Sequence, residues 1–121
     1  MAINKVLVVD DSPTELCNIT EIVSKTGCTV LRAANGKEAV ELAIKEKPDI
    51  IFMDIIMPEM DGYEATRHLS NDSATRDIPI IFVSSKNQKA DKLWAQMQGG
   101  KGYVTKPYTP EKIIDQIKAF N

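Results

Sequence analysis

Very little in this chain suggests a secreted, cross-linked or membrane protein. It has two cysteines, one histidine and one tryptophan in 121 residues. Cys17 and Cys28 lack the spacing of a metal site or a disulfide framework, so we expect free, mostly buried thiols. No apolar stretch approaches the ~20 residues of a membrane helix, and the N-terminus lacks the pattern of a signal peptide. We therefore expect a cytoplasmic protein without membrane insertion.

Neither sign of charge is in large excess, because the net charge is only −2. The distribution is uneven: residues 1–85 carry 14 acidic and eight basic residues, whereas residues 86–121 carry three acidic residues and seven lysines. This basic third is either a solvated helix face or a docking surface for an acidic partner. Nucleic acid is disfavoured, because these lysines are widely spaced and lack the arginine and aromatic residues that contact bases and strands.

What the chain does have is a regular alternation of apolar runs and segments of helical period. Its length and its 43% apolar content fit one domain, residues 1–121, with its own core. We expect strands over 5–10, 28–33, 49–54, 79–84 and 102–106.

Each expected helix follows a strand. The first is the best marked: Ser12 and Glu15 can form a capping box, Pro13 takes the first helical position, and Gly27 stops the helix. Helices two, three and five begin at residues 35–36, 61–62 and 109–110. In helix two, the residues expected to face the core are Ala39, Val40, Ala43 and Ile44. The fourth is weaker, with an apolar side formed by Leu93, Trp94 and Met97. Core packing is the favoured role for Trp94, and anchoring a partner is the alternative.

The burial pattern predicts the order of the strands. Residues 6–9, 50–53 and 80–83 are apolar throughout, as in strands covered on both faces, whereas 29–33 and 102–106 include polar residues and are typical of edges. With right-handed crossovers, the order 2-1-3-4-5 satisfies this pattern. We therefore predict an α/β fold with a doubly wound parallel sheet.

Acidic residues end the first and third runs, which this order places side by side. Asp10 and Asp11 follow the first run, and Asp54 follows the third. At ~5 Å and an effective dielectric of ~20, each pair of carboxylates repels by about 3 kcal/mol. The site must therefore take up a proton or a cation. Mg²⁺ fits best, because it accepts one or two carboxylates and keeps water or phosphoryl oxygens in its other positions.

Two further runs end at groups that suit a phosphoryl ligand. Ser84 follows the fourth run and Lys106 follows the fifth, so a hydroxyl and an ammonium join the carboxylates at one edge. Taken singly, each is more simply a loop hydroxyl or a terminal lysine, and their shared placement at strand ends favours function. Asp54 is then the expected nucleophile, forming an acyl phosphate that the cations stabilise.

These motifs together resemble the receiver domain of two-component response regulators. The resemblance lies in VLVVDDS at 6–12, AANGKEA at 33–39, PDIIFMDIIMPEMDG at 48–62, PIIFVSS at 79–85 and GYVTKP at 102–107. It spans nearly the whole chain and implies the CheY-like, flavodoxin-like (βα)5 fold. Residues 84–107 are similar to stand-alone PilH-type regulators of twitching motility and chemotaxis-like pathways.

The resemblance implies a role for each strand-end residue. Asp54 is expected to be the phosphoacceptor. The metal ligands would be Asp11, Asp54 and the main-chain carbonyl of Ile56, with Asp10 acting largely through water. Ser84 would be the switch hydroxyl, Tyr103 the aromatic that changes rotamer with it, and Lys106 the phosphoryl-binding cation. The family also has a cis peptide bond before Pro107.

Two positions depart from the pattern of the family. Ile56, two residues after Asp54, and Lys86, two after Ser84, stand where the family influences the attacking water. Because Ile56 has no polar group, we predict slow loss of the phosphate. Gly100 stands where small residues such as alanine are more common, and it is expected only to loosen the end of the fourth helix.

The resemblance implies a signalling phosphoacceptor that assists its own phosphorylation and dephosphorylation, rather than an enzyme. A sensor histidine kinase would donate the phosphate. Because the chain ends just after the fifth helix, we expect output by binding a protein through the face formed by helix four, strand five and helix five. The protein would drive a response or act as a phosphate sink.

Two other functions use a similar site or fold. A phosphohydrolase of the haloacid-dehalogenase class also uses an Asp nucleophile with Mg²⁺, but it needs an acid/base Asp at the position of Ile56. A flavodoxin-like FMN carrier needs a phosphate loop after the first strand, where Asp10 and Asp11 would repel a phosphate. Colourless purified protein would dismiss the flavin carrier.

Overall fold

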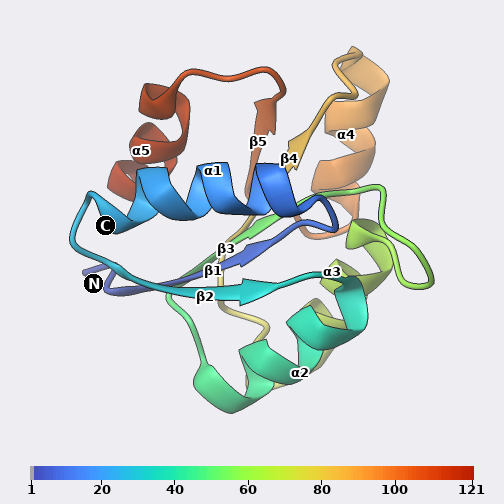
Figure 1. Cartoon of the computed structure of the whole chain (residues 1–121). Coiled ribbons are helices and arrows are strands. Elements are labelled where there is room, and N and C mark those ends of the chain that lie inside the picture. The colour runs from blue at the N-terminus through green and yellow to red at the C-terminus, as the bar shows by residue number, and fades with distance from the viewer. Residues whose placement is uncertain (1) are drawn as a thin grey trace.

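The computed structural model describes residues 2–121, and strands and helices alternate strictly along them (Figure 1). The strands are β1 (Lys5–Val9), β2 (Thr29–Ala33), β3 (Ile50–Met53), β4 (Ile80–Ser84) and β5 (Gly102–Thr105). The helices are α1 (Pro13–Ser24), α2 (Gly36–Glu46), α3 (Gly62–Asn71), α4 (Lys89–Met97) and α5 (Pro110–Ala119). Every expected element is present, and each strand begins and ends within one residue of its predicted bounds.

The strands form one parallel sheet in the order β2-β1-β3-β4-β5, as predicted from burial. Val9 of β1 pairs with Met53 of β3, and Ser84 of β4 pairs with Thr105 of β5. The residues that follow these positions therefore leave the sheet along one edge. Strands β1, β3 and β4 are buried almost throughout, whereas β2 and β5 are the partly exposed edges.

Helices cover both faces of the sheet, with α1 and α5 on one face and α2, α3 and α4 on the other (Figure 1). Two apolar clusters result. Ile19 and Val23 of α1 join Ile113 and Ile117 of α5 in one cluster. The other cluster takes in the buried residues of the opposite helices: Ala39, Ala43, Ala65, Leu69 and Ala95. Within residues 2–121, no helix has the length and apolar character needed to cross a membrane.

The predicted capping box of α1 forms only in half. The Ser12 hydroxyl accepts the Glu15 N–H at 3.4 Å, as predicted. The Ser12 N–H, however, donates to Oδ1 of Asp10 at 2.9 Å, so the carboxylate of Glu15 is free for another partner. The peptide bond between Lys106 and Pro107 is cis, as the family resemblance implied.

Three predictions about burial are wrong. Cys17 and Cys28 are free thiols, but Cys17 is exposed and Cys28 is only half-buried. Ile44, expected to face the core, is also partly exposed. The apolar side chains of α4 point away from the core: Leu93 is 58% exposed, Trp94 49% and Met97 67%. Only Ala95 of α4 is buried, so a small residue makes the contact with the sheet.

Candidate functional site

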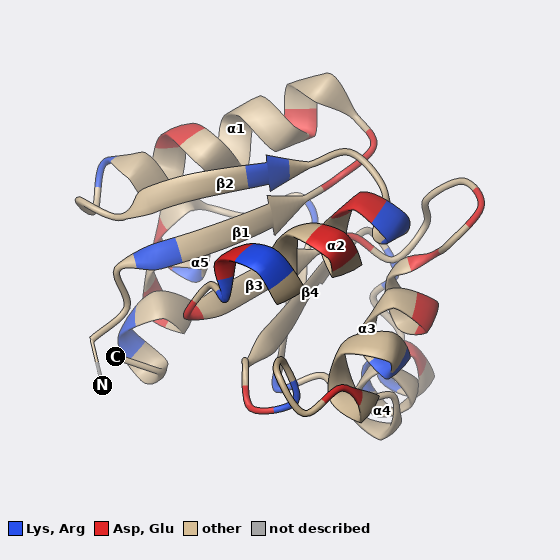
Figure 2. Ribbon diagram, turned by 90° about the horizontal axis from the view of Figure 1, so that it is seen from below, with Lys and Arg blue, Asp and Glu red and all other residues tan. Residues whose placement is uncertain are grey.

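Three carboxylates meet where β1 and β3 end. Asp10, Asp11 and Asp54 each offer an oxygen, and these atoms lie within 4.8 Å of one another. The backbone fixes the arrangement, since the Asp54 N–H donates to the Val9 carbonyl at 2.9 Å and the Asp10 N–H donates to the Ala33 carbonyl at 3.2 Å. Figure 2 shows acidic positions in red where the chain leaves β1 for α1. The structure therefore confirms that Asp10, Asp11 and Asp54 lie close together, as predicted.

Lys106 reaches this cluster from the end of β5. Its N–H donates to the Ser84 carbonyl at 2.8 Å, continuing the β4–β5 pairing by one residue. Its ammonium donates to Oδ2 of Asp10 at 3.0 Å and lies 3.6 Å from Oδ1 of Asp54. Burial works to lower the pKa of Lys106, but the hydrogen bond to Asp10 and the charge of Asp54 leave the pKa above its ordinary value. The lysine is therefore a permanent cation beside Asp54.

Sequence reasoning missed one member of this group. Oε2 of Glu15 lies 3.7 Å from Nζ of Lys106. The sequence assigned Glu15 to a capping box, and nothing in its spacing indicated that Asp10 would take the Ser12 N–H instead. A glutamate one turn after two strand-end aspartates is the only sequence feature that points to this contact.

The surroundings of Asp54 change the pKa of its carboxyl. Burial and the neighbouring charge of Asp10 raise its pKa to about 6, against the opposing charge of Lys106 and a hydrogen bond from the Ile55 N–H at 2.9 Å. An ionised Asp54 therefore costs free energy in the folded protein at neutral pH. Such a carboxylate is relieved by taking up a proton, a cation or a covalent modification.

The raised pKa predicts that Asp54→Asn stabilises the fold at neutral pH. In the unfolded chain the carboxyl ionises near pH 4 and in the folded chain near pH 6, so the free energy of unfolding falls as the pH rises between these values. Removing the charge should raise the free energy of unfolding at pH 7.5 by about 1–2 kcal/mol, measured by urea denaturation without divalent cations.

The gain should shrink as the pH is lowered towards 4, because the wild-type carboxyl is then protonated. Asp115→Asn removes an exposed charge on α5 and should change stability by less than about 0.5 kcal/mol. An Asp54→Asn protein that is less stable than wild type at pH 7.5 would contradict the assigned burial and repulsion.

Ser84 of β4 and Tyr103 of β5 stand on adjacent strands, two positions apart in register, and both form hydrogen bonds with Lys86. The buried hydroxyl of Ser84 accepts the Lys86 N–H at 3.2 Å, and the Tyr103 hydroxyl donates to the Lys86 carbonyl at 2.7 Å. The loop after β4 is therefore held from β4 through Ser84 and from β5 through Tyr103. A change in the hydrogen bonding of Ser84 would be felt by Tyr103 through the backbone of a single residue.

Ile56 lies in the loop after β3 and contributes no polar side chain to the site. It is 62% exposed, whereas its neighbour Ile55 is buried and donates its N–H to Asp54. The Ile55 carbonyl accepts the Gly62 N–H at 2.8 Å, which ties the loop to the start of α3. The role predicted for the Ile56 carbonyl as a metal ligand stays a prediction.

The chain is similar in sequence and in fold to known proteins. Residues 6–118 match the response regulator receiver domain. The chain belongs to the response regulator receiver domain family. Protein PilH of Pseudomonas aeruginosa is 46% identical over 95% of each chain, and protein PilG of the same organism is 38% identical over 95% of this chain and 85% of its own.

Solved structures of receiver proteins share the whole fold. The chemotaxis protein CheY4 of Vibrio cholerae superposes with a TM-score of 0.92 at 29% identity, covering 99% of this chain and 100% of CheY4. The receiver domain of a Pseudomonas aeruginosa sensor histidine kinase has a TM-score of 0.90 at 28% identity, over 98% of each chain, and has a magnesium ion coordinated in its active site cleft. In the present chain, the carboxylates of Asp10, Asp11 and Asp54 are hard oxygen ligands of the kind that Mg²⁺ prefers.

Proposed function

We propose that this receiver domain accepts a phosphoryl group on Asp54 from a sensor histidine kinase, with Mg²⁺, and thereby switches its binding to another protein. The observation that supports this most directly is the position of Asp54. Its carboxylate lies beside two other acids that can hold a cation and 3.6 Å from the ammonium of Lys106. This arrangement supports Asp54 as the proposed nucleophile, with the ammonium and a bound cation as the groups that would offset its charge.

The chemistry follows from the groups present. An oxygen of Asp54 would attack the phosphorus, forming an acyl phosphate, while the donor leaves with the electron pair of the broken bond. Asp11, Asp54 and the main-chain carbonyl of Ile56 would hold Mg²⁺, with Asp10 acting largely through water. The ion would offset the charge on the phosphoryl oxygens. Lys106 would bind one of these oxygens as it leaves its contact with Asp10.

Ser84 and Tyr103 would report the new charge. The Ser84 hydroxyl now accepts the Lys86 N–H, and it would turn to donate to a phosphoryl oxygen. The loop after β4 then loses one of its two anchors, and Tyr103, which holds the other, would change rotamer with it. A shift from 1:99 to 99:1 needs about 5.5 kcal/mol, which a few charge-assisted hydrogen bonds can supply.

A test of stoichiometry separates this function from a phosphohydrolase. Incubation with Mg²⁺ and acetyl phosphate, followed by intact mass, should show one phosphate per chain and only slow release. Turnover of many phosphates per minute without an adduct would favour the hydrolase. That class needs an acid/base aspartate two residues after its nucleophile, and here the position is occupied by the exposed, apolar Ile56.

We expect the aspartyl phosphate on Asp54 to be long-lived, because the side chain of Ile56 can neither orient nor activate water. Ile56→Asn places an amide at this position and should shorten the half-life of the phosphoprotein about tenfold. This is less than the roughly 10²–10⁴-fold of a positioned general acid or base, because an amide can orient water but does not take its proton. Release of phosphate after removal of the donor measures it. Ile44→Asn changes an equally apolar, partly exposed residue on α2 and should leave the half-life unaltered; equal half-lives in Ile56→Asn and wild type would refute the role of this position.

The similarity to PilH and PilG leads us to place the protein in a chemotaxis-like or twitching-motility pathway. We further propose that residues 1–121 act as one receiver domain in the cytoplasm and that the output is noncovalent protein binding. A second role, as a phosphate sink for such a pathway, follows from the same phosphorylation chemistry and needs no output partner.

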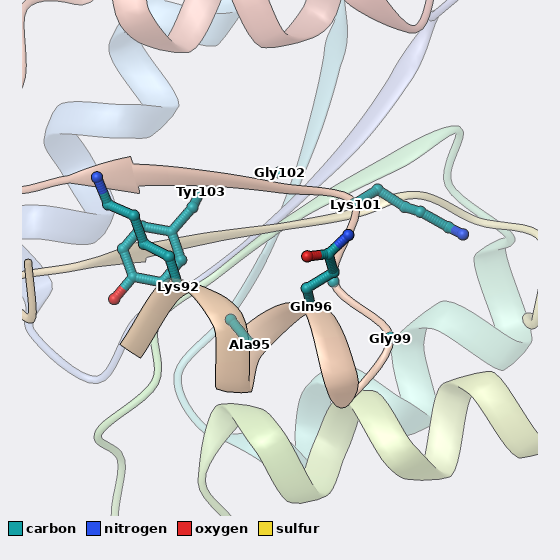
Figure 3. A pocket seen from close by; sticks show the side chains of 8 residues that line it. Lys92, Ala95, Gln96, Gly99, Lys101, Gly102 and Tyr103 are labelled. Carbon is teal, nitrogen blue, oxygen red and sulfur yellow. The ribbon is translucent and has the colours of Figure 1, made fainter. Parts of the chain in front are cut away.

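The proposed output face is formed by α4, β5 and α5. A groove of about 310 Å³ lies between α4 and β5, with Tyr103 and Lys92 at one end and Lys101 at the other (Figure 3). Beside it, α4 exposes the apolar side chains of Leu93, Trp94 and Met97. Lysines next to exposed apolar groups suit an acidic amphipathic segment, and Tyr103 links the groove to the switch.

Trp94 reports binding at this face, because it is the only tryptophan in the chain. A synthetic amphipathic peptide rich in Asp and Glu should alter its fluorescence at lower concentration once the protein is phosphorylated. A peptide with the same apolar residues and lysines in place of the acids is the control. Equal responses to the two peptides, or no dependence on phosphorylation, would argue against this face.

A further inference from the structure

The ammonium of Lys106 is shared by three carboxylates that differ in exposure. Those of Asp10 and Asp54, at 3.0 Å and 3.6 Å, belong to buried positions at the ends of β1 and β3. The third, Glu15 at 3.7 Å, comes from the first turn of α1, and its side chain is 38% exposed. Glu15 is therefore the solvent-facing partner of a lysine whose own side chain is only 18% exposed.

The local structure keeps Glu15 in this place. In a complete capping box its carboxylate would turn back to the N–H of Ser12, but that N–H is bound to Asp10. Glu15 and Lys106 also line one hollow of about 240 Å³, together with Asn18, Ser85, Pro107 and Tyr108. Of the two charged groups that line this hollow, the carboxylate of Glu15 is the more exposed.

The charge of Glu15 should matter for small donors of phosphoryl groups. Such donors carry one or two negative charges and must come close to a cluster that already holds Asp10, Asp11 and Asp54. Glu15 adds a fourth negative charge on the solvent side and also holds the ammonium that a phosphoryl oxygen has to recruit. Both effects oppose the entry of an anion, and both are electrostatic, so salt screens them.

We propose that Glu15 is a specificity-determining residue, which slows phosphorylation by free anionic donors and so reserves Asp54 for a docked protein donor. The proposal rests on the phosphorylation of Asp54 proposed above. In the step it controls, an Asp54 oxygen forms a bond to phosphorus, the bond between phosphorus and the acyl oxygen of acetyl phosphate breaks, and acetate leaves with the electron pair. Glu15 takes no covalent part in this step and acts on the approach of the donor and on Lys106.

The test compares rates of adduct formation in wild type, Glu15→Gln, Glu15→Asp and Glu21→Gln, with Mg²⁺ saturating each protein. Glu15→Gln should react with acetyl phosphate about threefold to tenfold faster in 0.1 M salt, where the screening length is about 10 Å, and less than about twofold faster in 1 M salt, where it is about 3 Å. Phosphoramidate, which carries less negative charge near neutral pH, should gain less from the substitution. Glu15→Asp keeps the charge and should stay close to wild type.

Glu21→Gln is the matched control, because Glu21 lies on the same helix, is well exposed and is 3.9 Å from Lys25 instead of Lys106. It should leave every rate unchanged. A Glu15→Gln rate equal to or below that of wild type, or a gain that is the same at both salt concentrations and for both donors, would overturn the proposal. A wild-type protein that forms no adduct at all would instead overturn the phosphorylation of Asp54, so the two failures are distinguishable.

Discussion

Gly62→Ala should lower the free energy of unfolding by about 3 kcal/mol or more, one of the largest losses expected from a single methyl group in this protein. A Cβ at position 62 would lie 2.1 Å from the carbonyl oxygen of Asp54 and 3.0 Å from Cα of Ile55. These are backbone atoms at the end of β3, so no side chain can rotate away. The hydrogen bond from the Gly62 N–H to the Ile55 carbonyl, at 2.8 Å, would be lost or distorted.

The same substitution should impair the site, because relieving the clash moves the backbone that carries Asp54. Urea denaturation measures the stability, and the rate of adduct formation with acetyl phosphate measures the effect on the site. Gly27→Ala is the control: Gly27 has a φ of +90° but no atom within 4 Å of an added Cβ, so only the backbone strain of about 1–2 kcal/mol is expected. Equal losses in the two variants would contradict the proposed packing of α3 against β3.

Lys106→Ala should reduce the rate of phosphorylation by acetyl phosphate about 100-fold, the usual effect of deleting one group that stabilises developing charge. The affinity for Mg²⁺ should change in the opposite direction. Without the ammonium that lies 3.0 Å from Asp10 and 3.6 Å from Asp54, the carboxylates attract a divalent cation more strongly. We expect Mg²⁺ to bind several-fold more tightly to the variant by calorimetric titration.

A slower phosphorylation together with tighter Mg²⁺ binding cannot result from misfolding, because a misfolded variant would lose both phosphorylation and Mg²⁺ binding. Lys101→Ala is the control, because it removes an exposed lysine that directly precedes β5, whereas Lys106 directly follows it. It should leave the phosphorylation rate and the Mg²⁺ affinity near those of wild type. A Lys106→Ala protein that phosphorylates at the wild-type rate would show that the lysine does not act on the phosphoryl group.

The sequence predicted the sheet and its edge well, for a physical reason. The runs at 6–9, 50–53 and 80–83 can be apolar throughout only if both faces are covered, which makes them the central strands. Right-handed crossovers then select the order 2-1-3-4-5, which the structure confirms. Once the order was known, the parallel direction of the strands placed Asp10, Asp54, Ser84 and Lys106 at one edge. The ammonium of Lys106 contacts the carboxylates of Asp10 and Asp54, whereas the Ser84 hydroxyl instead accepts the Lys86 N–H.

The sequence could not predict which way α4 turns. Leu93, Trp94 and Met97 repeat at helical spacing, and such a stripe is the same whether it faces a core or a partner. The sheet contact is made by Ala95, and the groove beside it depends on Gly99, Gly100 and Gly102. A spacing pattern of large apolar residues does not reveal that a small residue, Ala95, makes the contact between α4 and the sheet.

Glu15 illustrates the same limit at the site. Its spacing from Ser12 satisfies a capping box, and only the three-dimensional position of Asp10 decides that the Ser12 N–H is taken. The contact between Glu15 and Lys106 joins residues 91 positions apart in the chain, which no local pattern describes. Long-range polar contacts of this kind need the assembled fold.

Phosphorylation of Asp54 can be tested by locating the phosphate after reaction with acetyl phosphate and Mg²⁺. Borohydride reduction converts an aspartyl phosphate into homoserine, and peptide mass spectrometry then locates the modified residue. We predict a single homoserine at position 54 in wild type, none in Asp54→Asn, and none when EDTA removes the metal. Homoserine at another position, or an adduct of equal yield in Asp54→Asn, would contradict it.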